Sequence, residues 1–161
     1  MRAVRTAAFL ALAAGLCGGG ATAQAPAGFS GLDAVPLQGL SFGSLLPGVP
    51  EVVTVTDAAR RAEIVLNGSG LFDVTLVLPE AMVSSTGARM PLRFGAGDGA
   101  LLRNVSAALA AFDPLGTNRL RLDATQGPAR LLLGGTALPS REQTAGRYTT
   151  TIVVVITNPG T

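Results

Sequence analysis

The sequence predicts an all-β protein, a sandwich or a barrel of about eight strands. The chain has 161 residues, 48% of them hydrophobic and 14% charged, which supplies the core of one domain and does not suit disorder. Its 21 Gly and 10 Pro break the chain into short apolar segments separated by turns. Val, Ile and Thr are concentrated in these segments, and their branched side chains favour strands.

The pattern of residues 1–23 predicts a secretory signal peptide. Two Arg in "MRAVR" precede the uncharged apolar run "TAAFLALAAGLCGGG", and "ATA" then gives a cleavage site after Ala23. The run is shorter than the ~20 residues of a membrane span, so we expect no span after cleavage. Lipidation of Cys17 is left open, although Leu16 stands where lipidation signals carry a small residue. We therefore expect an exported protein, in the periplasm or at the cell surface.

The net charge of the chain comes from that segment. Twelve basic residues minus Arg2 and Arg5 leave ten, against ten acidic residues, so the net charge after cleavage is zero. The longest basic run is then Arg60–Arg61. This balance disfavours binding to nucleic acid.

The segments that follow divide into a lead segment or edge strand at residues 24–36, a domain at 37–157 and a tail at 158–161. In "LSFGSLLPGVPEVVTVT" two strand-like runs flank a Pro-Gly pair. Pro47 fixes the first φ angle of a turn and Gly48 allows the positive φ angle that follows, which predicts a tight turn between two strands.

The next two segments, "RAEIVLNGSG" and "LFDVTLVLP", predict a hairpin that turns at residues 67–70. Phe72, Val74, Leu76 and Leu78 are expected on one face of the second strand, and Asp73, Thr75 and Val77 on the opposite face. After the predicted strand "MPLRF" and the loop "GAGDGA", residues 101–112 fit a strand or one short helix, and the pattern leaves the two open.

The last third of the chain returns to clear alternation. In "NRLRLD", Leu120 and Leu122 are expected to face the core while the charged residues face water. A turn, the strand "ARLLL" and a Gly pair lead to the closing strand at residues 147–157. Both faces of this strand are apolar over residues 152–156, which predicts that it is covered on both sides.

The residue types needed for most catalytic sites are missing. The chain has no His and no Lys, and its one Cys lies in the predicted signal peptide, so a Ser-His-Asp triad, a thiol nucleophile, a Schiff base, a P-loop and a Cys/His zinc site are excluded. The ten acids are dispersed along turns and polar strand faces. We therefore expect no enzyme and no catalytic, cofactor-binding or metal-binding residues.

Two weaker patterns are better explained by ordinary structure. The loop around Asp98 lacks the last Gly of a dinucleotide fingerprint, where Ala100 stands, and the ligand series of an EF-hand. Arg119, Arg121 and Arg130 suggest an anion-binding patch, but charges alternating along the wet face of a strand explain them as well.

Three segments in order, "LSFGSLLPG", "RLLLGGTALP" and "TAGRYTTTIVVVIT", resemble the bacterial domain-of-unknown-function family 4402. The resemblance spans residues 40–157 and implies an exported, immunoglobulin-like β-sandwich, akin to the spore-coat-U and fimbrial subunits. It provides no catalytic residue to transfer. One departure is Arg147, which stands where a small residue or Thr often precedes the Tyr of the last strand.

These observations favour a structural or surface protein, a pilin-like or coat-like subunit that joins copies of itself or other surface subunits by strand addition. The candidate donor is Phe29–Leu37, and the pattern identifies no acceptor edge. The alternative is a monomeric periplasmic or surface binding module for a glycan or protein partner. With one Tyr, six Phe and no Trp in the chain, few aromatic side chains are available for a sugar-binding face.

Overall fold

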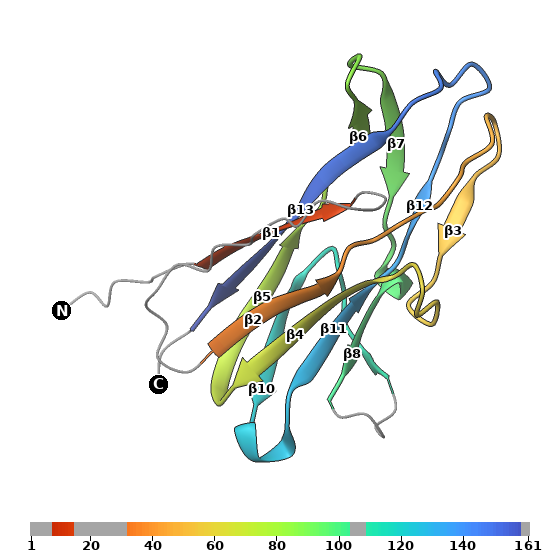
Figure 1. Ribbon diagram of the computed structural model, residues 1–161. Helices are drawn as coiled ribbons and strands as arrows, with labels where there is room; N and C mark the ends of the chain where they lie inside the picture. The colour runs from red at the N-terminus through yellow and green to blue at the C-terminus, as the bar shows by residue number, and fades with distance from the viewer. Residues whose placement is uncertain (1–7, 15–31, 104–108, 159–161) are drawn as a thin grey trace.

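The computed structural model describes residues 8–14, 32–103 and 109–158. In these ranges the chain forms thirteen strands and two short 3₁₀ helices, and every strand pair is antiparallel. The strands form two sheets that pack face to face (Figure 1). The prediction of a single all-β antiparallel sandwich is therefore confirmed.

The smaller sheet has five strands. Its order is β2 (Leu32–Gln38), β4 (Ala62–Gly68), β11 (Ala129–Leu133), β8 (Gly99–Leu102) and β9 (Ala110–Ala111).

The larger sheet has eight strands. Seven follow the order β10 (Thr117–Leu122), β5 (Gly70–Val77), β13 (Tyr148–Thr157), β6 (Ala81–Ser84), β7 (Arg89–Arg93), β12 (Gly135–Ala137) and β3 (Glu51–Val53), and β1 (Ala8–Ala14) pairs with β13 outside this path. The strand number exceeds the predicted value of about eight because several strands have only two to four residues.

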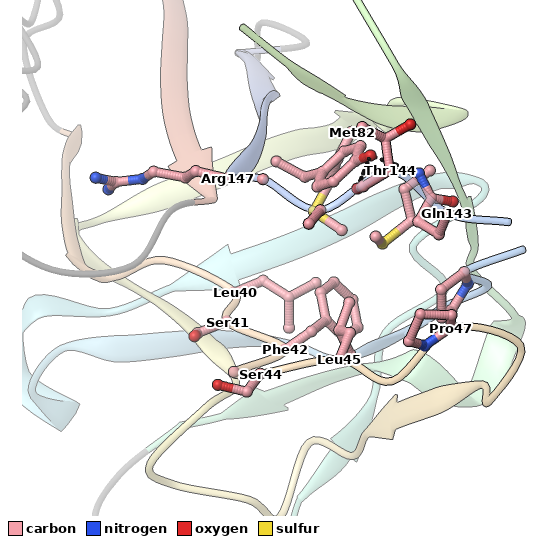
Figure 2. Close-up of a pocket in the computed structure, with 16 residues that line it drawn as sticks. Leu40, Ser41, Phe42, Ser44, Leu45, Pro47, Met82, Gln143, Thr144 and Arg147 are labelled. Carbon is pink, nitrogen blue, oxygen red and sulfur yellow. Dashed lines mark hydrogen bonds between the residues drawn. The ribbon is translucent and has the colours of Figure 1, made fainter. Parts of the chain in front are cut away.

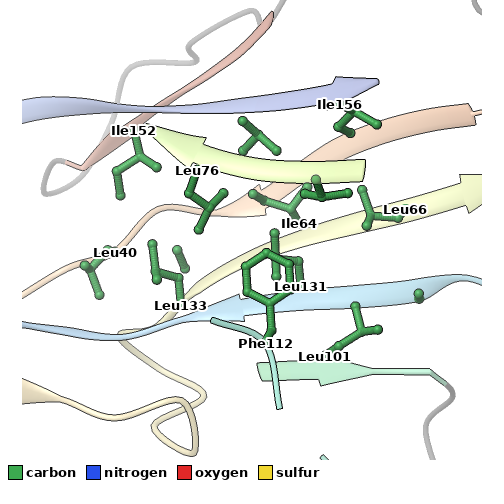
Figure 3. Close-up of a cluster of buried hydrophobic side chains, with 14 of the residues drawn as sticks. Leu40, Ile64, Leu66, Leu76, Leu101, Phe112, Leu131, Leu133, Ile152 and Ile156 are labelled. Carbon is green, nitrogen blue, oxygen red and sulfur yellow. The ribbon is translucent and has the colours of Figure 1, made fainter. Parts of the chain in front are cut away.

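The core fills the space between the sheets (Figure 3). Ile64, Leu66 and Leu131 enter it from the smaller sheet, and Leu76 and Ile152 from the larger one. The predicted inward faces are confirmed in β5 (Phe72, Val74, Leu76) and in β10 (Leu120, Leu122). Among the described residues no helix is long and apolar enough to cross a membrane.

The predicted hairpin between "RAEIVLNGSG" and "LFDVTLVLP" is wrong. β4 and β5 lie in different sheets, so Ser69 and its neighbours lead the chain from one layer of the sandwich to the other. Ser69 Oγ accepts a hydrogen bond from Ala124 N at 2.9 Å, which ties this connection to the turn after β10. The buried residues of the two strands meet across the core. Alternating apolar residues bury one face of each strand in this arrangement, as they would in a hairpin.

The described part of residues 101–112 forms strands and not the short helix that the sequence left open. Leu101 and Leu102 lie in β8, Ala110 and Ala111 in β9, and these two strands pair. Residues 104–108 lie outside the described residues. The neighbouring strand β11 pairs with β8, so sheet hydrogen bonding decides the conformation in spite of the Ala-rich composition.

The Pro-Gly turn is confirmed, but only one of its flanking strands exists. Gly48 has a φ angle of +75°, and Val49 N donates to Leu46 O at 3.1 Å. β3 follows, whereas residues 40–45 belong to no strand and line a cleft.

The closing strand is covered differently from the prediction. Ile152, Val154 and Ile156 are buried in the core, but Val153 and Val155 on the outer face are only half-buried. A two-layer sandwich has solvent outside each sheet, which explains why only one face is fully covered.

Candidate functional site

A cleft of about 550 Å³ opens between two segments that are far apart in the sequence. Residues 40–47, which follow β2, form one wall, and residues 139–148, which lead into β13, form much of the other (Figure 2). Met82 and Met90 complete the lining from β6 and β7. The cleft therefore lies between the segment that follows β2 and strands of the larger sheet, at the start of β13.

Hydrogen bonds fix both walls of the cleft. Ser41 N donates to Arg60 O at 2.8 Å, and Gly48 N donates to Ser140 O at 3.0 Å. In the opposite wall the Tyr148 hydroxyl donates to Thr144 O at 2.7 Å and lies 2.6 Å from Gln143 Nε2. The walls are thus positioned by the fold before any ligand arrives.

The chemistry of the cleft suits an apolar occupant. Leu40, Phe42 and Leu45 project from one wall. Among the described residues that line the cleft none has a carboxylate, and Arg147 is the only one with a charge. Such a surface suits a hydrophobic side chain or an extended peptide.

The edge of β13 next to the cleft accepts a strand. Ala8–Ala14 pair with β13 at seven consecutive positions without a shift, from Ala8 opposite Ile156 to Ala14 opposite Thr150. β5 pairs with Val153–Thr157, so β1 and β5 hold opposite edges of β13. We call the edge that β1 covers, Thr150–Ile156, the β13 edge.

The β13 edge lacks the devices that protect other strand edges. Thr150–Ile156 contains no charge, no Pro and no Gly. By contrast β2 has Asp33 and Pro36, β3 begins with Glu51, and β9 is two residues long. Charges and prolines discourage pairing with another chain, so the β13 edge is the least protected of these edges.

The outer face beside this edge is also apolar. Val153 stands opposite Val77 of β5, whose side chain is 55% exposed, and Val155 stands opposite Thr75. Val83 of β6 is 41% exposed.

Charged residues gather elsewhere, around Glu63 on β4. Glu63 is 8% exposed and accepts hydrogen bonds from Arg130 Nη1 at 2.5 Å and from Arg61 Nη2 at 3.2 Å. Burial raises the pKa of this carboxyl, but the two guanidinium groups outweigh burial and lower the pKa below its usual value of 4.5. The Glu63 carboxylate is thus held by two guanidinium groups, one on β11 and one from the residue two positions before Glu63.

A second network joins Arg60 to Glu51 and Asp57. The hydrogen bond from Arg60 is the main cause that lowers the pKa of Asp57. Both networks tie the loop after β3 to its neighbours.

The two weaker sequence patterns do not form sites. Arg119 and Arg121 lie on β10 in the larger sheet and Arg130 on β11 in the smaller one, so the structure does not bring the three together. Asp98 accepts a hydrogen bond from Gly95 N at 2.8 Å and closes its own turn. Within the described ranges no three His, Cys, Asp or Glu residues are grouped to hold a metal ion.

The predicted donor segment is already paired in part. Leu32–Leu37 belong to β2, and Leu32–Pro36 pair with β4 within the smaller sheet, while residues 29–31 lie outside the described residues. Cys17 and the predicted cleavage site at Ala23 also lie outside them.

Sequence reasoning missed the β13 edge as an acceptor. The available signal was the strand itself, whose residues 150–156 contain no charge, Pro or Gly. Which of its two edges is left for β1 depends on the order of strands in the sheet, and residue patterns do not encode that order directly.

Comparison with known proteins does not identify a family for this chain. No family model matches the chain, and neither the curated proteins nor the solved structures contain a match. The resemblance to the family 4402 described above stays a prediction.

Proposed function

We propose that this protein is a non-enzymatic, exported structural or surface subunit that assembles by strand addition. The observation that carries the proposal is the β13 edge, where seven consecutive residues without charge or proline accept an added strand. The strand that occupies this edge, Ala8–Ala14, belongs to the segment that the sequence predicts to be removed on export. Processing would leave a strand-length site ready for a partner.

Assembly of the processed protein tests this proposal. The full chain is expressed with its own N-terminus in a bacterium, recovered from the periplasm or medium, and checked by mass spectrometry for cleavage after Ala23. We expect concentration-dependent oligomers by light scattering and linear assemblies by electron microscopy. A processed protein that stays monomeric at millimolar concentration contradicts the proposal.

The cleft supports a second candidate, a binding module for a glycan or protein partner. It has an apolar lining, and Tyr148 and Gln143 supply polar groups at its rim. Saturable binding of a glycan by a monomeric processed protein, lost in the Phe42→Ala variant, would favour this function over the structural one.

A further inference from the structure

We infer that the cleft beside β13 binds the anion of a long-chain fatty acid, with its alkyl chain against the core and its carboxylate at Arg147. The inference concerns the cleft and not the β13 edge. It therefore goes beyond the proposed assembly and is tested separately from it.

The floor of the cleft is part of the hydrophobic core. Leu40, Phe42, Met82 and Met90 line the cleft, and all four belong to the cluster of buried side chains that holds the sandwich together. Figure 2 shows Leu40, Phe42 and Leu45 on one side of the cleft and Met82 on the other. A chain of methylene groups that enters between these walls meets apolar atoms on both sides.

The two methionines allow this floor to adjust to its occupant. Met82 of β6 stands opposite Met90 of β7 in their ladder, so both reach the cleft from neighbouring strands. Methionine side chains are unbranched and polarizable, and they adapt to irregular apolar shapes. An alkyl chain has no fixed shape and suits such a wall. The volume of about 550 Å³ lies within the range of ~300–1,000 Å³ that is typical of small-molecule sites.

The hydrogen-bonding groups of Tyr148 and Gln143 are already used within the wall. The Tyr148 hydroxyl donates to Thr144 O at 2.7 Å and accepts from Gln143 Nε2 at 2.6 Å. Gln143 Nε2 also donates to Arg89 O at 3.2 Å, and Gln143 Oε1 accepts from Ser140 N at 3.2 Å. A ligand rich in hydroxyl groups would have to break these bonds, whereas an alkyl chain leaves them intact.

The rim of the cleft is polar and has one charge. Ser44, Thr144 and Arg147 are exposed, in contrast to the buried floor. Since the part of the lining that the structure describes has a cation and no carboxylate, it favours an anion over a cation. Figure 2 shows the Arg147 side chain extending away from the apolar side chains of the two walls. An apolar floor with a positive charge at its rim complements a molecule with an apolar tail and an anionic head.

Arg147 can meet a carboxylate in addition to the contact that it already makes. It takes part in another interaction within the chain. A guanidinium group has five N–H donors, more than one partner uses. Two of them in parallel match the two oxygens of a carboxylate, and the charge of both groups strengthens these hydrogen bonds.

The single Tyr of the chain reports directly on the cleft. Tyr148 lines it, and the chain has one Tyr and no Trp, so tyrosine fluorescence comes from this site alone. The full chain is expressed with its own N-terminus, recovered after export and freed of bound lipid on a hydrophobic resin. It is then titrated with dodecanoate and with dodecyltrimethylammonium, each below the concentration at which it forms micelles. We expect a saturable change with dodecanoate and binding of the cationic ligand that is at least tenfold weaker.

Two pairs of variants locate the bound molecule. Leu45→Gln places an amide in the apolar wall, whereas Leu46→Gln makes the same change at an exposed side chain outside the lining. Arg147→Gln removes the charge of the rim, and Arg141→Gln removes an exposed charge outside the lining. We expect the changes at Leu45 and Arg147 each to weaken dodecanoate binding roughly tenfold. The two controls should bind like the parent protein.

Three results would overturn the inference: no saturable response of Tyr148 to dodecanoate, equal affinity for the cationic ligand, or unchanged affinity in Arg147→Gln. Because Arg147 is exposed, its replacement should leave the urea midpoint unchanged, so that a loss of binding reports on the site. Saturation by a neutral peptide of alternating Leu and Ser, with no binding of dodecanoate, would assign the cleft to a peptide and also overturn the inference. Light scattering of the same preparation measures assembly, and its outcome bears on the proposed function alone.

Discussion

β10 and β13 belong to the same sheet, and each borders β5, yet their remaining edges differ in chemistry. On β10, Arg119 forms an ion pair with Asp73, and Arg103 Nη1 donates to Arg121 O at 2.8 Å, so a guanidinium group covers a backbone carbonyl of that edge. On β13, the residues from Thr150 to Ile156 carry no charge, and an added strand supplies the backbone partners.

The difference indicates that the two strands have been shaped by different requirements. Both contribute to the core, through Leu120 and Leu122 on β10 and through Ile152 and Val154 on β13. Only β10 has charges that discourage pairing with another chain. Both strands therefore stabilise the core, whereas the proposed assembly involves the edge of β13 alone.

The largest expected effect comes from placing a charge on the β13 edge. Val153→Lys puts an ammonium group on the outer face of the edge, where pairing with a second chain would bring it beside the donor. We expect the exported variant to lose assembly completely in light scattering. The control is Val77→Lys, which places the same charge on the facing residue of β5, away from the edge, and it should assemble like the parent protein.

The next effect concerns the core and should not distinguish the two strands. Ile152→Ala and Leu122→Ala each remove buried methyl groups, and each should lower the free energy of unfolding by about 2–5 kcal/mol in urea titrations. Val77→Ala, on an exposed side chain, should change it by less than about 0.5 kcal/mol. If only Ile152→Ala lowered the free energy of unfolding strongly, the two strands would differ in their contribution to the core as well as in their edges.

Removing the charges of β10 should make its edge resemble the β13 edge. We expect Arg119→Thr with Arg121→Thr, introduced together with Val153→Lys, to restore weak association at high concentration, measured by sedimentation. If this protein stays monomeric, charge is not what separates the two edges.

The smallest effect is a dependence of stability on pH that arises away from both edges. The pKa of Glu63 is lowered in the folded protein, so its contribution to stability is complete above the usual carboxyl pKa of 4.5 and is lost as the pH falls through the lowered value. We expect the urea concentration at the unfolding midpoint to decrease as the pH is lowered below 4.5. Glu63→Gln should be less stable at pH 7 and show a shallower decline, with Asp57 and Asp123, whose pKa values are also lowered, accounting for the remaining slope. An identical decline in both proteins would contradict this role of Glu63.

Local patterns predicted the parts of the fold that depend on neighbouring residues. The inward faces of β5 and β10 follow from alternation, and the turn at Pro47–Gly48 follows from the φ angles that these two residues allow. The failed hairpin at residues 67–70 shows the limit, because alternation is the same whether two strands pair in one sheet or face each other across the core.

The candidate site could not be predicted either, because local patterns do not tell which distant segments of the chain meet. The cleft joins residues 40–47 to residues 139–148, and no local pattern links segments so distant in the chain. The closing strand was recognised, but which of its edges pairs with β1 depends on the position of β5 in the sheet.

Amide hydrogen exchange of the processed protein tests most directly whether the β13 edge is open and then filled by another copy. In an antiparallel strand, alternate amides point to alternate edges, so about half of those in Thr150–Ile156 face away from β5. The account predicts that these amides exchange rapidly in dilute monomers and become protected as the concentration rises, while the amides of β10 do not change. Equal protection of the β13 edge at every concentration, or new protection on β10 instead, would contradict it.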